Sequence, residues 1–159
     1  MGFMQINDLK VHYPIRGGFF NRVIDNVHAV DGISMELERG KAYGLVGESG
    51  CGKSTTGKSI VGLEKISSGS IIYEGENVTN RRRDRSSSFN RDIQMIFQDS
   101  TSAMNPRKRV KDILAEPIRN FLNLTPQEES KKISELLEIV GMPEDAKVKY
   151  PHEFSGGQK

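Results

Sequence analysis

The 159-residue sequence has few of the features that mark secreted, membrane-spanning or polyanion-binding proteins. It contains a single cysteine, Cys51, which excludes an internal disulfide framework and a metal site built from several cysteines. No apolar run reaches the roughly 18 residues of a membrane-spanning helix, and the start MGFMQINDLKVHY lacks the basic and apolar regions of a signal peptide. The net charge is only +2, so any anion site must be local. We therefore expect a cytosolic protein.

One short segment carries a specific phosphate-binding pattern. GESGCGKST, residues 47–55, fits G-x-x-x-x-G-K-[ST]. Gly47 and Gly52 would let backbone N–H groups curl around an anion, and Lys53 would bring a positive charge to the phosphates. A glycine turn without a ligand is the alternative, but an apolar segment before the loop and a helical pattern after it disfavour that interpretation. The candidate nucleotide-binding residues are Gly47, Glu48, Ser49, Gly50, Cys51, Gly52, Lys53, Ser54 and Thr55.

The first part of the chain is predicted to contain several strands around this loop. The patterns predict strands over 3–13, 27–37, 41–47, 68–78 and 93–99, and a helix over 54–65. Residues 14–26 contain Pro14, Gly17 and Gly18 and are expected to form a loop. We interpret the basic stretch 81–92 as a solvated loop, with contact to lipid headgroups or a partner subunit as the alternative.

The second part of the chain is predicted to be helical. Apolar residues recur on one side of a helix that begins at Val110, and Pro117 is expected to kink or break it. A second helix has clearer ends, because Thr125 can cap it, Glu128 completes a T-x-x-E capping box and Gly141 can end it.

The chain ends on FSGGQK, residues 154–159, where two glycines lie between a serine and a glutamine. Such a stretch is typical of a phosphate-contacting turn at the start of a helix, but S-x-x-Q is also a capping box, with Ser155 as the N-cap and Gln158 at the third helical position. Only Gln158 and Lys159 follow the glycines, and we expect no helix to form from so few residues.

Taken in order, these motifs resemble those of the ATP-binding subunits of ABC transporters. IFQD, residues 96–99, is similar to the Q-loop of that family, and FSGGQ, residues 154–158, is similar to its signature motif. The resemblance covers essentially the whole chain. Within that family, the resemblance is to the ATP-binding subunits of bacterial oligopeptide and dipeptide importers. Two stretches are close to the sequences of that group: AVDGISMELERGKAYGLVGESGCGKSTTGKSIVGLEKISSGSI and YPHEFSGGQ. QDSTSAMNPR departs from the usual wording of that group at Ser100, Ala103 and Met104, in a region expected to contact the membrane subunit.

The resemblance implies an α/β fold, a P-loop NTPase of the ABC ATPase type, with a β-subdomain, a parallel core sheet and a helical subdomain. It assigns residues 1–98 to the nucleotide-binding core with its N-terminal β-subdomain, 99–154 to the helical subdomain and 155–159 to the start of the signature helix. The C-terminal part of the core is expected to be missing from these residues, together with the family's Asp-Glu strand, dimer loop and γ-phosphate histidine. We therefore expect the 159-residue chain itself to lack hydrolytic activity.

The resemblance also implies roles for individual residues toward two cofactors, ATP and Mg²⁺. Tyr13 would stack on adenine, with Phe19 and Phe20 as rivals, and the alternative is that all three are core aromatics. Ser54 and Gln98 would help to hold Mg²⁺, and Gln98 would also hold the attacking water. The signature residues would contact ATP held on a partner subunit. They are Ser155, Gly156, Gly157 and Gln158.

The implied function is that of an ATP-binding subunit that powers peptide import through ATP binding and hydrolysis. Its expected location is the cytoplasmic face of a bacterial cell membrane. The expected partners are a second, homologous ATP-binding subunit, two membrane-spanning permease subunits and, indirectly, an extracellular peptide-binding protein, with no nucleic acid. Two alternatives stay open: a nucleotide-binding fragment without turnover, and a soluble ABC ATPase that does not act in transport. The second is disfavoured because no long coiled-coil insert appears between Gln98 and Ser155.

Overall fold

The computed structural model describes residues 3–79, 88–99 and 103–158. The chain divides into two compact units, Met1–Met95 and Ile96–Lys159, and each is described here by itself. Most of the basic stretch 81–92, and Ser100 of the Q-loop region, lie outside the described residues.

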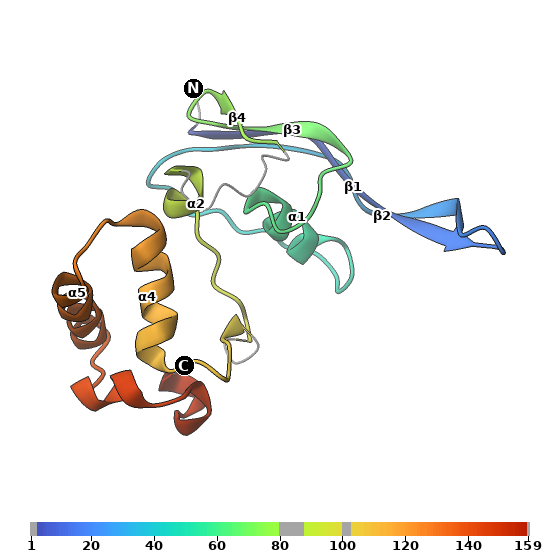
Figure 1. Ribbon diagram of the computed structural model, residues 1–159. Coiled ribbons are helices and arrows are strands. Elements are labelled where there is room, and N and C mark those ends of the chain that lie inside the picture. The colour runs from blue at the N-terminus through green and yellow to red at the C-terminus, as the bar shows by residue number, and fades with distance from the viewer. Residues whose placement is uncertain (1–2, 80–87, 100–102, 159) are drawn as a thin grey trace. The chain divides into compact units, whose positions relative to one another are not determined.

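The first unit is built on a four-stranded antiparallel sheet in the order β2-β1-β3-β4 (Figure 1). The strands are β1 (Met4–Gly17), β2 (Arg22–Leu37), β3 (Ser68–Tyr73) and β4 (Glu76–Asn77). β1 lies between β2 and β3, so that Met4 is opposite both Leu37 and Tyr73. Its alternate side chains fill the core together with residues of the short helix α2 (Ser88–Asp92). The prediction of a strand over 68–78 with a turn at EGEN is confirmed by β3 and β4, whereas the turn also expected at Gly69 is wrong, because Gly69 lies in β3.

The prediction of a loop over residues 14–26 is wrong, because most of this segment extends β1 and β2 into a long hairpin. Figure 1 shows this hairpin, in blue, reaching past the rest of the sheet. The connecting turn is short: Asn21 N donates to Gly18 O at 3.1 Å, and both residues have positive φ, 50° and 73°. The β-branched residues Val23, Ile24 and Val27 favour strand structure in spite of the glycines nearby.

The strands expected over 41–47 and 93–99 are also absent among the described residues. Tyr43 is 52% exposed and Val46 is 88% exposed, although the segment is apolar. A strand is stabilised by the ladder hydrogen bonds of its neighbours, and neither segment has a paired neighbour in the described sheet. All the described pairings are antiparallel, so the parallel core sheet that we expected is not formed by these residues.

The helix after the glycine loop is present but shorter than expected. We expected it over 54–65, whereas α1 spans Lys53–Ile60. Gly62 has a φ of 71°, and Leu63 N donates to Lys58 O at 2.8 Å, so the chain reverses there instead of continuing the helix.

The second unit is helical, with α4 (Val110–Phe121), α5 (Pro126–Ile139) and the 3-10 turns η1 (Glu144–Val148), η2 (Pro151–Glu153) and η3 (Gly156–Gln158). Its core is formed by Ala115, Ile118, Ile133, Leu137 and Ala146. Arg119 of α4 donates two hydrogen bonds of 2.7 Å to the carboxylate of Glu129 on α5. These bonds hold the pKa of Glu129 below its usual value. Pro117 lies inside α4, so the break that we considered there does not occur.

The capping box predicted for the second helix is confirmed at the start of α5. Glu128 N donates to Thr125 Oγ1 at 3.3 Å, and Thr125 N donates to Glu128 Oε2 at 2.8 Å. The backbone bond from Thr125 lowers the pKa of Glu128. At the other end, Gly141 has a φ of 69°, as a helix-ending glycine requires.

Replacing the cap residue is therefore expected to destabilise the second unit. Thr125→Ala removes the side-chain acceptor of the Glu128 N–H and should lower the free energy of unfolding by about 1 kcal/mol. Urea unfolding followed by helical circular dichroism measures this change. Thr125→Ser keeps the hydroxyl and serves as the control. If the alanine and serine variants unfold at the same urea concentration, the box does not stabilise α5.

Candidate functional site

The glycine-rich loop lies between the exposed segment 41–46 and the first turn of α1. Gly52 is the N-cap of α1 and adopts the left-handed conformation, with φ 92° and ψ 2°. A Cβ atom at Gly52 would lie only 2.1 Å from Ala29 O, on β2. At Gly47, a Cβ atom would lie 2.7 Å from Cys51 Sγ. Gly52 therefore requires glycine, both for its φ and for the close approach of the Ala29 backbone, whereas a side chain at Gly47 would require Cys51 to move.

Lys53 places its ammonium group over this loop. Lys53 Nζ donates to Gly47 O at 2.8 Å and to Glu48 O at 2.5 Å, and it lies 3.6 Å from Cys51 Sγ. An ammonium group has three hydrogen-bond donors and no acceptor. The donors that bind these carbonyl oxygens can therefore also bind an anionic oxygen, such as that of a phosphate. The arrangement concentrates positive charge on the inner side of the loop.

The N-terminus of α1 adds to this positive potential. The first N–H groups of a helix have no partner within the helix and carry the positive end of its dipole. Thr56 is the first residue whose N–H is paired, donating to Gly52 O at 2.8 Å. Ser54 lies in this first turn, directly after Lys53, and is exposed. The loop and the helix end together present N–H donors, an ammonium group and a hydroxyl, which is the chemistry of a polyphosphate site.

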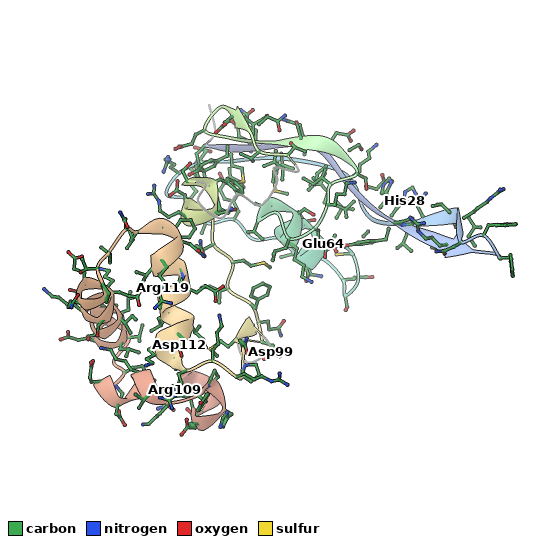
Figure 2. The ribbon with its side chains drawn as sticks, in the orientation of Figure 1. His28, Glu64, Asp99, Arg109, Asp112 and Arg119 are labelled. Atoms are coloured by element: carbon green, nitrogen blue, oxygen red, sulfur yellow. The ribbon has the colours of Figure 1, made fainter. Side chains whose placement is uncertain are left out.

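Tyr13 of β1 lies beside the same helix. Partial desolvation and a hydrogen bond to the carboxylate of Glu64, which follows α1 (Figure 2), raise the pKa of the Tyr13 hydroxyl. A hydrogen bond with the Thr55 side chain acts in the opposite direction. Tyr13 is 39% exposed, so its ring is accessible to a ligand. Sequence reasoning missed Glu64, because nothing in the local pattern links it to a tyrosine on a distant strand.

The rival aromatics lie elsewhere on the hairpin. Phe19 is 100% exposed and Phe20 is 76% exposed, and they contact each other edge to face in the turn, with ring centroids 5.6 Å apart. The interpretation of Tyr13, Phe19 and Phe20 as core aromatics is therefore wrong. Of the three, Tyr13 is the one that contacts residues of the α1 region.

The remaining candidate residues belong to the second unit. Gln98 is exposed and lies outside regular secondary structure. Ser155 N donates to Gln158 Oε1 at 3.0 Å, as in a capping box, and Gln158 N donates to Ser155 O at 3.0 Å. Ser155 Oγ donates to Gln158 Oε1 at 3.1 Å, so this hydroxyl is not the acceptor that a full box requires. Gly156, Gly157 and Gln158 form the single 3-10 turn η3, and no α-helix is formed by the described residues at this end, as we expected.

No helix in the described part of the chain has the length and hydropathy needed to cross a membrane.

Comparison with known proteins assigns these features to a family. Residues 30–159 match the ABC transporter family. Over 156 residues the chain is 55% identical to the oligopeptide transport ATP-binding protein OppF of Lactococcus lactis subsp. lactis, covering 98% of this chain and 49% of that protein. Over 158 residues it is 41% identical to the nickel import ATP-binding protein NikE of Escherichia coli O157:H7, covering 99% of this chain and 58% of that protein.

The fold is similar to that of a solved structure, a dimeric ATP-binding cassette in a post-hydrolysis state bound to ADP and Pi. The TM-score is 0.75 at 21% identity, covering 98% of this chain and 64% of the other. At this identity the likeness concerns the fold alone, which is the expected α/β fold of the ABC ATPase type. The chain spans 49% of the length of OppF, so its match is to about half of such a protein. The family match includes the phosphate loop, IFQD and FSGGQ, and it covers most of the sequence. The chain belongs to the ABC transporter family.

Proposed function

We propose that this chain is the nucleotide-binding part of an ATPase subunit that powers oligopeptide import by binding and hydrolysing ATP. The observation that carries the proposal is the ammonium group of Lys53, held over a glycine loop by Gly47 O and Glu48 O at 2.8 and 2.5 Å. The identity of 55% to an oligopeptide transport protein, against 41% to a nickel import protein, favours peptides over nickel as the transported solute.

The phosphates of ATP would bind to the loop 47–55. A phosphate oxygen would replace Gly47 O and Glu48 O as the acceptor of Lys53, so that the ammonium group donates to a charged oxygen instead of to neutral carbonyl oxygens. Backbone N–H groups between Gly47 and Thr55 would donate to the other oxygens. In this proposal Glu48, Ser49, Gly50 and Cys51 supply backbone and shape, and Lys53 supplies charge.

Mg²⁺ fits the residues of the first turn of α1. Ser54 is exposed there and offers a hydroxyl oxygen, the hard ligand type that Mg²⁺ prefers. When bound, Mg²⁺ would neutralise phosphate charge. Gln98, which is exposed in the second unit, is proposed to offer a second oxygen and to orient the attacking water.

Tyr13 is proposed to stack on the adenine ring. Tyr13→Ala is then expected to weaken ATP binding by about tenfold, because stacking of a base on an aromatic ring contributes about 1–3 kcal/mol. Inorganic triphosphate, which has no base, should bind the variant and the original protein equally well. Isothermal titration calorimetry with both ligands measures the difference.

The matched control for this prediction is Phe20→Ala, which removes a more exposed aromatic ring from the hairpin turn. It should leave ATP affinity unchanged. A loss of ATP affinity in the Phe20 variant, with none in the Tyr13 variant, would mean that Phe20, and not Tyr13, stacks on adenine.

The partners of this subunit follow from the same proposal. Ser155, Gly156, Gly157 and Gln158 would contact ATP on a second, homologous subunit, and two permease subunits would bind the pair at the cytoplasmic face of the membrane. An extracellular peptide-binding protein would deliver the solute. The relatives above are named as transport proteins, which disfavours the soluble, non-transport alternative.

The transport proposal is tested by deleting the gene and measuring uptake of a labelled oligopeptide and of nickel by the cells. We expect peptide uptake to be lost, nickel uptake to be unchanged, and the intact gene, but not a Lys53→Ala copy, to restore peptide uptake. Normal peptide uptake in the deletion strain, or a loss of nickel uptake alone, would contradict the proposal.

A further inference from the structure

A cluster of three potential metal ligands lies on the β1–β2 hairpin, and the nucleotide site does not use it. His12 of β1 is directly opposite His28 of β2 in the strand register, and Asp31 follows on β2. One ligand atom from each residue lies within 4.8 Å of the others. Figure 2 labels His28 on the hairpin.

Two distances in this cluster are close to those between the ligands of a tetrahedral metal ion. Asp31 Oδ1 lies 3.3 Å from His12 Nε2, and Asp31 Oδ2 lies 3.5 Å from His28 Nδ1. Two ligand atoms at about 2.0–2.1 Å from a tetrahedral Zn²⁺ ion are about 3.3 Å apart. Most direct N–H···O hydrogen bonds are shorter, about 2.7–3.2 Å. The two contacts use different oxygens of Asp31, and the three ligand atoms lie within 4.8 Å of one another, so the carboxylate and the rings would rotate to bind the same ion.

The backbone fixes the two histidines in this arrangement. Their rings are stacked, with centroids 4.0 Å apart and an angle of 19° between planes. Ser67 Oγ accepts a hydrogen bond from His12 N at 2.9 Å, which ties this point of β1 to the segment before β3. The neighbouring cation Lys10 lies 3.6 Å from Asp8, so it pairs with a carboxylate outside the cluster. The strand register therefore holds the two histidines together, and the rings would rotate out of the stacked arrangement for both nitrogen lone pairs to point to one cation.

The site is accessible from solvent. The side chains of His28 and Asp31 are 52% and 56% exposed, and that of His12 is 24% exposed. An ion could therefore reach all three ligands, and a water molecule could complete its coordination.

We propose that His12, His28 and Asp31 form a binding site for one Zn²⁺ ion. Two imidazoles and one carboxylate favour an ion of the zinc, nickel and copper class over Mg²⁺ or Ca²⁺, which prefer oxygen ligands. The ion would join β1 to β2 one residue from Tyr13 and so restrain the strand pair that carries this ring. This proposal is independent of the transported solute and of ATP hydrolysis.

The test is calorimetric titration of the full chain with ZnCl₂, without nucleotide and after removal of bound metal with a chelator. We expect one Zn²⁺ per chain at this site. His28→Ala and the nearly isosteric Asp31→Asn should each weaken it by more than about tenfold, because even outer-shell partners of metal ligands contribute about 10- to 100-fold. His152→Ala removes the histidine of the second unit, which stacks on Tyr150, and should leave the affinity unchanged.

Cobalt provides a second measurement that distinguishes this site from one at Cys51. Co²⁺ bound here should give the visible absorption of a site with nitrogen and oxygen ligands, without a thiolate charge-transfer band. Equal Zn²⁺ affinity in the original protein and in both cluster variants would overturn the proposal. So would a thiolate band, or a loss of binding confined to the His152 variant.

Discussion

Lys53→Ala is expected to weaken ATP binding about 10- to 100-fold. The side chain provides a positive charge that Gly47 O and Glu48 O hold over the loop at 2.8 and 2.5 Å. A hydrogen bond to a charged group contributes about 1.5–3 kcal/mol, and each 1.4 kcal/mol corresponds to a factor of ten in affinity. Calorimetric titration with ATP measures the change, and titration with adenosine shows whether base binding is preserved.

The matched control is Lys58→Ala. Lys58 lies in the last turn of the same helix, so this variant removes the same charge from α1 at the end away from the loop. It should bind ATP within about twofold of the original protein, because Lys58 is half-buried and lies outside residues 47–55, the segment assigned to the phosphates. If both lysine variants lose ATP affinity equally, the affinity depends on the total charge of α1, and the assignment of Lys53 to the phosphates is wrong.

Gly52→Ala is expected to abolish ATP binding and to destabilise the first unit. The added Cβ atom would lie 2.1 Å from Ala29 O, and the φ of 92° is one that L-residues rarely adopt. The loop or β2 must therefore move, and the first turn of α1 moves with it. Urea unfolding and ATP titration of the same preparation measure both consequences.

Gly50→Ala separates backbone strain from steric overlap. Gly50 also has a positive φ, 83°, but a Cβ atom there would meet nothing within 4 Å. Gly50→Ala should lower the free energy of unfolding only by the strain of the left-handed conformation, about 1–2 kcal/mol. Gly52→Ala should lower it by more. Equal destabilisation by the two variants would mean that the contact with Ala29 does not constrain the loop.

The features that could be predicted from sequence are those with local causes. The capping box of α5 depends on Thr125 and Glu128, which are three residues apart, and the structure confirms it. The turn between β3 and β4 contains Gly75, with a φ of 84°, and the segment around it was also predicted correctly. In such cases the hydrogen bonds that stabilise an element are made within a few residues of it.

The features that could not be predicted depend on distant partners. The segment 41–47 has the apolar pattern of a strand but stays outside the sheet, since a strand requires a neighbour that its own sequence does not specify. Residues 14–17 and 22–26 form strands because β1 and β2 pair with each other up to the turn that joins them. The contact of Tyr13 with Glu64, and the approach of Ala29 to Gly52, likewise arise from tertiary structure.

The central claim is that residues 47–55 bind the phosphates of ATP, and Cys51 provides its most direct test. This cysteine lies within the loop and is exposed, and it is the single cysteine of the 159 residues. The measurement is the rate of alkylation of Cys51 by N-ethylmaleimide, followed by mass spectrometry of the peptide that contains it. We predict that ATP with Mg²⁺ slows this reaction and that adenosine at the same concentration does not. An alkylation rate unchanged by ATP, at a concentration that saturates the protein, would contradict the assignment of this loop as the phosphate site.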